Sequence, residues 1–367
     1  MIHLAPAVAK PLRDLGSILR GQLSGETATH VAIDPALADF AIRRHKCGPL
    51  LHLAVKAGAN ADGEASAMLS ADWQGNRRAY LRNHVTADRI ATALEPDQIP
   101  ALALKGASVA ALLYPDPLWR HSGDLDLFVP ARLMPEALHA LGTLGLIGDA
   151  PVLALSSGMQ RTLFRFIRDV SVDDGWTDAH VEVHGRPLLS GRLSRFLTRN
   201  DSSLTPRPVP KEGVLPRPAL DTGFGLYLLW HGCVSGWSRL KWLVDLIPLL
   251  ERSGPAGREA LAQAAEQSRT SAAVKASLAL LESVFGAIDL APLDRWMAQG
   301  RDSAAVQARL RAYTSWIDGP EAAIPMGTSR AMTHALLMLN DRRADQLALL
   351  SDAAGSRLAR EFARRMA

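Results

Sequence analysis

The stretch that runs from residue 104 to residue 129 constrains this chain more than any other part of its sequence. It reads LKGASVAALLYPDPLWRHSGDLDLFV: a glycine turn, a short apolar helix, then an apolar strand that begins at a pair of aspartates. Alternate side chains of a strand point to opposite faces, so Asp124 and Asp126 share one face while Leu125 and Leu127 enter the core. Two carboxylates on one face repel each other unless a cation lies between them, and hard oxygen ligands of this kind suit Mg²⁺.

A second apolar strand supplies a third carboxylate. In AHVEVHG the alternation places the two valines on the core face and leaves His180, Glu182 and His184 on the opposite face. The carboxylates of Asp124, Asp126 and Glu182 can together hold two divalent ions, which activate an acceptor oxygen and neutralise a triphosphate. The pattern therefore predicts a site for two Mg²⁺ ions, with Mn²⁺ as the alternative ion.

The turn before the first helix of this segment is suited to phosphate. An apolar strand is followed by Lys105 and Gly106 and then by a helix, whose first N–H groups and positive dipole end attract an anion. Gly106 allows a close approach that a side chain would prevent, although glycine is also common at such turns for geometric reasons alone. Ser108 can contact phosphate or cap its own helix. Arg120 can bind phosphate through two hydrogen bonds or pair with Asp124.

Periodicity and prolines divide the chain into regions. Helical spacing of apolar residues predicts an N-terminal helical region over residues 1–95, and mixed strand and helix patterns predict a core over 96–205. Five prolines fall between residues 206 and 218, which excludes a helix or a central strand and predicts a linker over 206–220. Residues 221–367 read as a C-terminal helical domain. The fold class that follows is α+β, with helical regions on both sides of the core.

One long helix is expected over residues 226–250. Helical spacing would place Trp230, Trp237 and Lys241 on one face of it. We expect the tryptophans to pack on the core rather than to stack on a nucleobase. Lys241 can pair with Asp245 four residues further on, or it can contact a phosphate.

Composition excludes several classes of protein. A hydrophobic share of 48% and a net charge of +4 are those of a globular protein, and no block of basic residues forms a stripe for duplex nucleic acid. Cys47 and Cys233 lie far apart in apolar contexts, so buried thiols are expected rather than a disulfide or a cysteine zinc site. Neither a signal-like apolar stretch nor a run long enough for a membrane helix is found, which predicts a cytoplasmic protein with no membrane partner. Oligomeric state leaves no trace in the sequence.

Three separated motifs resemble the nucleotidyltransferase superfamily typified by DNA polymerase beta, and specifically a poorly characterised bacterial branch of it. In that branch the first motif reads LKG followed by R-x-x-G-D-x-D, the second reads vElH and the third reads H…W-x-R-L-K-W-x-x-D; the match covers roughly residues 35–290. The matching positions are Lys105, Gly106, Arg120, Gly123, Asp124, Asp126, Glu182, His184, His231, Trp237, Arg239, Leu240, Lys241, Trp242 and Asp245.

The resemblance implies a polymerase beta-like core and metal-dependent transfer of a nucleotidyl group. The donor would be an NTP such as ATP, and the group would pass to a hydroxyl or phosphate of an acceptor that is an RNA, a peptide or a small molecule. The superfamily usually has Gly-Ser or Gly-Gly at the turn, whereas this chain has Gly106 and Ala107. The predicted catalytic and metal-binding residues are Asp124, Asp126 and Glu182; the predicted nucleotide- and phosphate-binding residues are Lys105, Gly106, Ser108, Arg120, Gly123 and Lys241; the candidate acceptor-site residues are His184, His231, Arg239 and Trp242.

Three alternatives stay open. The same fold with another donor could tailor a peptide or a sugar, and a degenerate copy of the fold could be a nucleotide-binding module without activity. His180 and His184 could instead bind zinc, with Glu182 as the base of a hydrolase. Such a zinc pair is typical of a helix, whereas this valine-rich segment lies close to Gly185 and Pro187 and reads as a strand. The degenerate module is disfavoured because all three acids are present.

Overall fold

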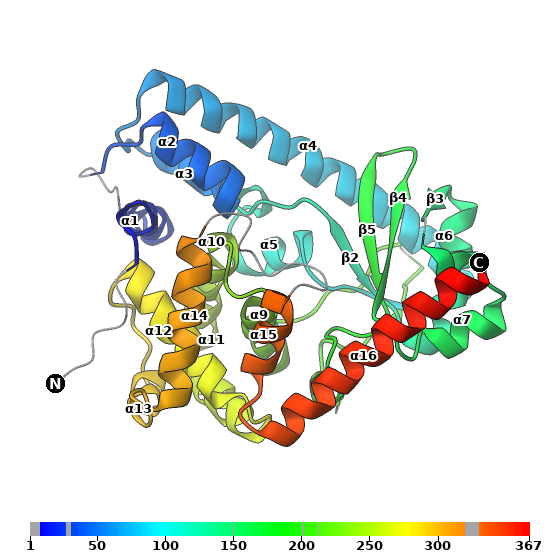
Figure 1. Cartoon of the computed structure of the whole chain (residues 1–367). Helices are drawn as coiled ribbons and strands as arrows, with labels where there is room; N and C mark the ends of the chain where they lie inside the picture. Colours follow the sequence, from blue (N-terminus) through cyan, green and yellow to red (C-terminus); the bar gives the residue numbers. More distant parts are fainter. Residues whose placement is uncertain (1–7, 27–30, 149, 200–201, 212, 320–329) are drawn as a thin grey trace. The chain divides into compact units, whose positions relative to one another are not determined.

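The chain folds into two compact units, each assembled from several segments (Figure 1). A computed structural model describes residues 8–26, 31–148, 150–199, 202–211, 213–319 and 330–367. Unit 1 comprises the described residues of 1–76, 113–121 and 225–346, and unit 2 comprises those of 77–112, 122–224 and 347–367. This division does not test the domain boundaries expected from the sequence, which remain predictions.

Unit 1 is built from helices. Apolar residues recur every three or four positions along α1, at Leu12, Leu15 and Leu19, and this buried stripe packs against α3 and α12. Helix α12 in turn packs against α14. The elements of unit 1 are α1 (Lys10–Ser24), α2 (Pro35–Asp39), the π-helix η1 (Phe40–His45), α3 (Gly48–Lys56), the first part of α4 (Gly63–Leu94), η2 (Pro117–Trp119), α9 (Thr222–Val234) from residue 225 on, α10 (Leu240–Val244), α11 (Leu246–Gln267), α12 (Ser271–Phe285), α13 (Leu293–Ala298), α14 (Ala304–Asp318) and α15 (Arg330–Leu339).

The single helix expected over residues 226–250 is wrong. Helix α9 ends at Val234, because Gly236 and Trp237 both have positive φ, at 63° and 50°, which no α-helix accommodates. Trp237 folds back so far that a Cβ on Gly232 would lie 2.2 Å from its indole ring. Trp230 and Trp237 are fully buried, as expected, but they do not share a helix face with Lys241.

Unit 2 contains one mixed six-stranded sheet in the order β3-β4-β5-β2-β1-β6. Strand β2 runs parallel to β5 and antiparallel to β1, and β4 and β5 form an antiparallel hairpin. Strands β2, β4 and β5 can be followed side by side in Figure 1. The strands are β1 (Pro100–Ala103), β2 (Leu125–Phe128), β3 (Leu146–Ile147), β4 (Asp169–Asp174), β5 (Ala179–His184) and β6 (Arg207–Pro208).

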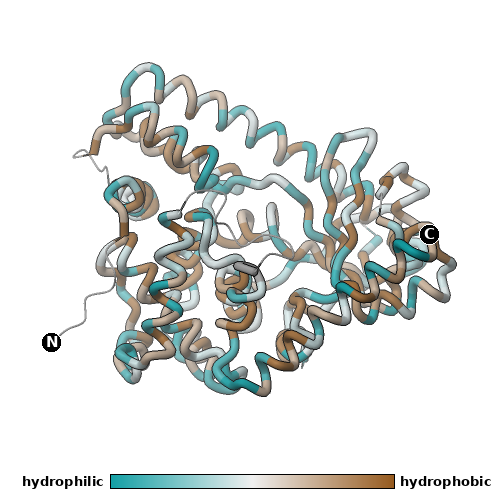
Figure 2. The backbone as a smooth tube through the Cα atoms, in the orientation of Figure 1, coloured by the Kyte–Doolittle hydropathy of each residue, from teal (hydrophilic) through white to brown (hydrophobic). Residues whose placement is uncertain are grey.

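Period-2 alternation decides which face of this sheet becomes the core. Leu125, Leu127, Val181 and Val183 belong to one buried apolar cluster, and the polar residues between them face the other way. Helices cover the cluster, including the second half of α4 and the second half of α16. Along α16, hydrophilic and hydrophobic residues alternate (Figure 2). The remaining elements are α5 (Ala107–Leu113), η3 (Ala131–Leu133), α6 (Met134–Thr143), η4 (Pro151–Ala154), α7 (Ser157–Leu163), α8 (Gly191–Leu197) and α16 (Arg343–Met366). The predicted α+β class is confirmed.

The proline-rich stretch contributes to the sheet. Its residues Arg207 and Pro208 form β6, an edge strand that pairs with Pro100 and Ala101 of β1. Proline is tolerated at an edge because its missing N–H faces away from the ladder.

Cys47 and Cys233 are buried and, in the described part of the chain, neither forms a disulfide, as predicted. Among the described helices, none combines the length and the apolar character needed to cross a bilayer.

Candidate functional site

Two neighbouring strands of unit 2 bring two of the predicted acids together. In the parallel register of β2 and β5, Asp126 lies directly beside Glu182. His184 lies two residues beyond Glu182 and therefore shares its face of the sheet. One ligand atom from each of these three side chains lies within 4.8 Å of the other two. We call Asp126, Glu182 and His184 the acid cluster.

The side chains of Lys105 and His184 converge on one oxygen of Asp126. Nζ of Lys105 lies 2.7 Å from Oδ1, and Nε2 of His184 lies 2.9 Å from the same atom. The same imidazole nitrogen is 3.3 Å from Oε2 of Glu182. The side chain of Asp126 is only 2% exposed, so its charge depends on these partners for stability. Glu182 is 31% exposed and is the member of the acid cluster that solvent reaches most easily.

These contacts set the protonation states. Burial alone would raise the pKa of Asp126, but Lys105 and His184 bring it well below its ordinary value. Burial would lower the pKa of His184, but its hydrogen bonds with Asp126 and Glu182 raise it above 6.5. The hydrogen bond with His184 lowers the pKa of Glu182. Near neutral pH, both carboxylates are therefore ionised.

A third strand, β4, contributes an acid near Nδ1 of the His184 imidazole. Asp169 of β4 lies opposite His184 of β5, and its Oδ2 is 3.9 Å from Nδ1 of the ring. Arg168 and Arg360 both bind Asp169, the latter at 2.6 Å from Oδ1. Nδ1 of His184 is buried and has no hydrogen-bond partner among the described residues. Sequence analysis missed Asp169, because only the register of the β4–β5 hairpin indicates which residue faces His184.

The turn before α5 lies directly against the aspartate motif. Gly106 has a φ of 62°, and a Cβ at this position would lie 2.8 Å from the backbone oxygen of Asp124. The turn therefore needs glycine both for its conformation and for its close approach to the chain. Ser108 is buried in the first turn of α5, and its N–H donates to the carbonyl of Lys105 at 3.2 Å. Gly123 and Asp124 precede β2 and are partly exposed, and Asp124 does not belong to the acid cluster.

Arg120 belongs to unit 1 and forms a buried ion pair there. Its Nε lies 2.9 and 3.0 Å from the two carboxylate oxygens of Asp245, and its Nη2 lies 3.0 Å from Oδ2. Tyr114 donates its hydroxyl to Oδ1 of Asp245 at 2.8 Å. The structure thus pairs Arg120 with Asp245, and both a contact of Arg120 with Asp124 and its role in phosphate binding stay predictions.

The candidate acceptor residues of unit 1 gather around one indole ring. His231 meets Trp242 edge to face, with 5.3 Å between the ring centroids. The guanidinium of Arg239 lies 5.9 Å from the centroid of the same ring. Lys241 is the neighbour of Trp242 in α10 and is partly exposed. Their roles remain predictions.

Comparison with known proteins now adds to this geometry. A family model described as an uncharacterised nucleotidyltransferase matches residues 33–286, well over half of the chain. The chain belongs to this nucleotidyltransferase family. The resemblance inferred from the motifs is confirmed, and membership implies a nucleotide substrate. Searches of curated proteins and of solved structures gave no match.

The acid cluster of this nucleotidyltransferase fits a divalent ion. Its two ionised carboxylates offer the hard oxygen donors that Mg²⁺ and Mn²⁺ accept, and the imidazole of His184 would add a nitrogen donor once it has released its proton. Among the described residues, His180 does not join Glu182 and His184 in a group that could hold a metal ion, and its Nδ1 lies 2.7 Å from Oδ1 of Asp173 on β4 instead. This arrangement disfavours the zinc pair of His180 and His184 that the sequence left open.

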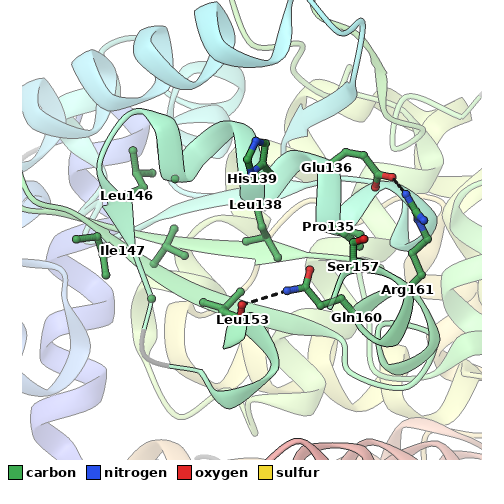
Figure 3. A pocket seen from close by; sticks show the side chains of 13 residues that line it. Pro135, Glu136, Leu138, His139, Leu146, Ile147, Leu153, Ser157, Gln160 and Arg161 are labelled. Carbon is green, nitrogen blue, oxygen red and sulfur yellow. Dashed lines mark hydrogen bonds and ion pairs between the residues drawn. The ribbon is translucent and has the colours of Figure 1, made fainter. Parts of the chain in front are cut away.

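A separate cavity of about 640 Å³ lies at the β3 end of the sheet in the nucleotidyltransferase (Figure 3). It is lined by residues of α6, α7, β3 and η4, with His139, Ser157 and Gln160 among its polar groups. Glu136 and Arg161 form an ion pair at its wall, and the amide of Gln160 donates to the carbonyl of Leu153. None of the predicted site residues lines this cavity.

Proposed function

We propose that this protein transfers a nucleotidyl group from an NTP to a hydroxyl or phosphate of an acceptor, with divalent metal ions held at the acid cluster. The observation that carries the proposal is the β2–β5 register, which sets Asp126 directly beside Glu182 on the polar face of the sheet. Membership of a nucleotidyltransferase family supports the same chemistry. The acceptor is an RNA, a peptide or a small molecule.

In this proposal, Asp126 and Glu182 hold the ions, with His184 or Asp124 completing their coordination. When bound there, Mg²⁺ or Mn²⁺ would supply Lewis-acid chemistry that lowers the pKa of the acceptor hydroxyl and neutralises charge on the phosphates. The acceptor oxygen forms a bond to the α-phosphorus, the bond from that phosphorus to the bridging oxygen breaks, and pyrophosphate leaves. In the proposal Glu182 accepts the proton of the acceptor hydroxyl, and its being the more exposed acid of the cluster supports this role.

Lys105 has two tasks in the proposed reaction. Its ammonium group stabilises the buried charge of Asp126. A flexible four-carbon stem also lets the same group reach a phosphate oxygen close to the turn at Gly106. A lysine that moves between a carboxylate and a phosphate would lower the electrostatic cost of both the free and the nucleotide-bound states.

Radiolabel transfer tests the proposal. The purified protein is incubated with each α-³²P-labelled NTP, Mg²⁺ or Mn²⁺, and a cell extract, and label is sought in RNA, in protein and in small molecules. Glu182→Gln and Asp126→Asn should each reduce transfer at least about a hundredfold, since each removes a group that binds metal. Asp173→Asn is the matched control, because Asp173 lies on the same sheet but its side chain is exposed and pairs with His180, outside the acid cluster.

Two outcomes would contradict the proposal. One is an absence of label in any acceptor with every NTP, which would favour a binding module. The other is transfer that survives Asp126→Asn unchanged. Calorimetry of NTP binding with and without Mg²⁺ gives an independent readout. If the affinity for NTP changes neither when Mg²⁺ is removed nor in Asp126→Asn, a metal centre at the acid cluster is excluded.

A further inference from the structure

Helix α16 lies beyond residue 286, where the match to the family model ends. Its residues 347–366 belong to unit 2, which also contains the acid cluster. Ala359 and Ala363 of this helix are buried in the apolar core of unit 2. The helix is therefore anchored on unit 2 at positions on both sides of Arg360.

Arg360 connects this helix to the sheet. Helix α16 passes the end of β4 and β5 (Figure 1), and Arg360 reaches from it to Asp169, the first residue of β4. Nη2 of Arg360 lies 2.6 Å from Oδ1 of Asp169 and donates to the backbone carbonyl of the same residue at 3.0 Å. Arg168 binds the other carboxylate oxygen, with its Nε 2.7 Å from Oδ2. Because each oxygen has its own guanidinium, the orientation of the carboxylate is fixed.

Asp169 and the acid cluster face different nitrogens of the His184 ring. Nε2 of the ring lies 2.9 Å from Oδ1 of Asp126 and 3.3 Å from Oε2 of Glu182. Nδ1 lies 3.9 Å from Oδ2 of Asp169, the residue opposite His184 in the β4–β5 register. Nδ1 is buried and, within the described part of the chain, makes no hydrogen bond. The Asp169 carboxylate is therefore close to the ring nitrogen that the acid cluster leaves unused.

A carboxylate in this place controls which nitrogen of an imidazole is available to a metal ion. An acid that faces Nδ1–H keeps the proton on that nitrogen and leaves the lone pair of Nε2 for the ion. The distance of 3.9 Å exceeds a hydrogen bond by about 1 Å, so a small movement of the ring towards Asp169 would close the gap. The ring would then keep a defined orientation after its hydrogen bond with Asp126 is broken.

We propose that Asp169 and Arg360 are positioning residues for the acid cluster. Asp169 orients the imidazole of His184 through Nδ1, and Arg360 holds Asp169 in place from α16. The inference rests on the proposed function, because it takes His184 as a ligand of the metal ion. Neither Asp169 nor Arg360 belongs to a motif found in the sequence, and Arg360 lies outside the residues that the family model matches.

The sign of one effect separates positioning from simple electrostatics. Removing a positive charge near a cation site should by itself strengthen the binding of the cation. The positioning role predicts the reverse for Arg360→Gln. Oδ1 of Asp169 loses its guanidinium, the carboxylate is free to turn away from His184, and the binding of the metal ion weakens.

Calorimetry with Mn²⁺ alone, on the full chain without nucleotide, measures this effect. Arg360→Gln and Asp169→Asn should each weaken Mn²⁺ binding about tenfold, the size expected for a residue that orients a metal ligand. Arg364→Gln is the matched control for the first variant, since it removes a charge one turn further along α16 from an exposed side chain that pairs with Glu361. Asp173→Asn is the control for the second variant, because Asp173 lies on the same strand but pairs outside the acid cluster.

Three further measurements would not respond to a merely structural role. In the metal-free protein, the ring ¹⁵N NMR signals of His184, assigned by their loss in His184→Asn, should move in Arg360→Gln and stay in place in Arg364→Gln. Arg360→Lys should recover most of the lost Mn²⁺ affinity, because both contacts with Asp169 come from one nitrogen and an ammonium group can replace it. The double variant Asp169→Asn with Arg360→Gln should bind Mn²⁺ no more weakly than Asp169→Asn alone, since Arg360 acts through Asp169.

Several results would overturn the inference. It fails if Arg360→Gln binds Mn²⁺ as tightly as Arg364→Gln, if the His184 signals do not move in Arg360→Gln, or if the losses of affinity in the double variant add. It also fails if the wild type binds no Mn²⁺. Mn²⁺ binding that is unchanged in Asp126→Asn would contradict it as well, because the ion would then not lie at the acid cluster.

The positioning role and the proposed reaction can fail separately. If Glu182→Gln abolishes transfer while Arg360→Gln and Asp169→Asn bind Mn²⁺ like their controls, the reaction stands and the positioning role falls. If no NTP supports transfer but Arg360→Gln weakens Mn²⁺ binding and moves the His184 signals, the positioning role stands and the reaction falls.

Discussion

Replacing Arg120 with methionine should destabilise unit 1 strongly. The side chain of Arg120 is 6% exposed and that of Asp245 is 3% exposed, and three hydrogen bonds of 2.9–3.0 Å join them. Methionine removes the positive charge but keeps much of the apolar volume. It leaves the carboxylate of Asp245 buried with the hydroxyl of Tyr114 as its remaining side-chain partner among the described residues, and breaking a buried ion pair in this way costs about 3–5 kcal/mol.

Two further variants turn this expectation into a ranking. Tyr114→Phe removes one hydrogen bond to a charged acceptor and should cost about 1.5–3 kcal/mol. The double variant Arg120→Met with Asp245→Leu replaces the pair with apolar side chains of similar size, which is often neutral for buried pairs. It should therefore be more stable than Arg120→Met alone, although it carries an additional substitution.

Tryptophan fluorescence in urea is a suitable assay because it reports mainly on unit 1. Of the eight tryptophans in the chain, all but Trp176 lie in unit 1, and Trp176 is 72% exposed. A loss below about 1 kcal/mol for Arg120→Met would refute the reasoning, because it is the value of an exposed pair. The reasoning would also be refuted if the stability lost by the double variant equalled the sum of the losses of Arg120→Met and Asp245→Leu. A double variant that folds but no longer binds NTP would instead establish the predicted phosphate contact of Arg120.

Three other substitutions test particular features. Gly106→Ala should destabilise unit 2 by about 1 kcal/mol or more in urea unfolding and reduce transfer, because the new Cβ meets the backbone of Asp124; unchanged values would show that the turn relaxes freely. Burial raises the pKa of Asp72 in the folded protein from the usual 3.8 to about 6, so the wild type loses stability as pH rises from 4 to 6. Asp72→Asn should therefore be more stable than the wild type by about 1–2 kcal/mol at pH 8, and equally stable below pH 4. A constant difference at all pH values would contradict this. Gly232→Ala should lower the melting temperature, because Trp237 occupies the space of the new methyl group; a melting temperature like that of Gly75→Ala, where a Cβ meets nothing, would argue against that packing.

The acid cluster was largely predictable from sequence, and the reason is geometric. Period-2 alternation alone put Asp126 on the polar face of one strand, and Glu182 with His184 on the polar face of another. The family motif then made the two strands neighbours. Sequence could not show that Lys105 would pair with Asp126, since that contact depends on how the turn at Gly106 curls back.

Other contacts could not be predicted from the sequence, because they join residues that no local pattern connects. Arg120 and Asp245 are 125 positions apart, and an arginine fits a phosphate contact as well as a buried pair. The break after α9 was different, because Gly236 was visible in the sequence. Apolar residues keep their helical spacing across this break, so periodicity alone predicts a continuous helix and does not indicate the left-handed backbone of Gly236 and Trp237.

The pairing of β2 with β5 makes the site and the fold inseparable. Because side chains alternate strictly, sliding β5 by one residue would push Glu182 into the apolar interior and expose Val181 or Val183 in its place. An extra residue inserted within β5 should thus disrupt the proposed metal site and the core together. The same insertion in the 175–178 turn of the β4–β5 hairpin should leave both intact, so the chain can vary in length at this loop but not along the strand.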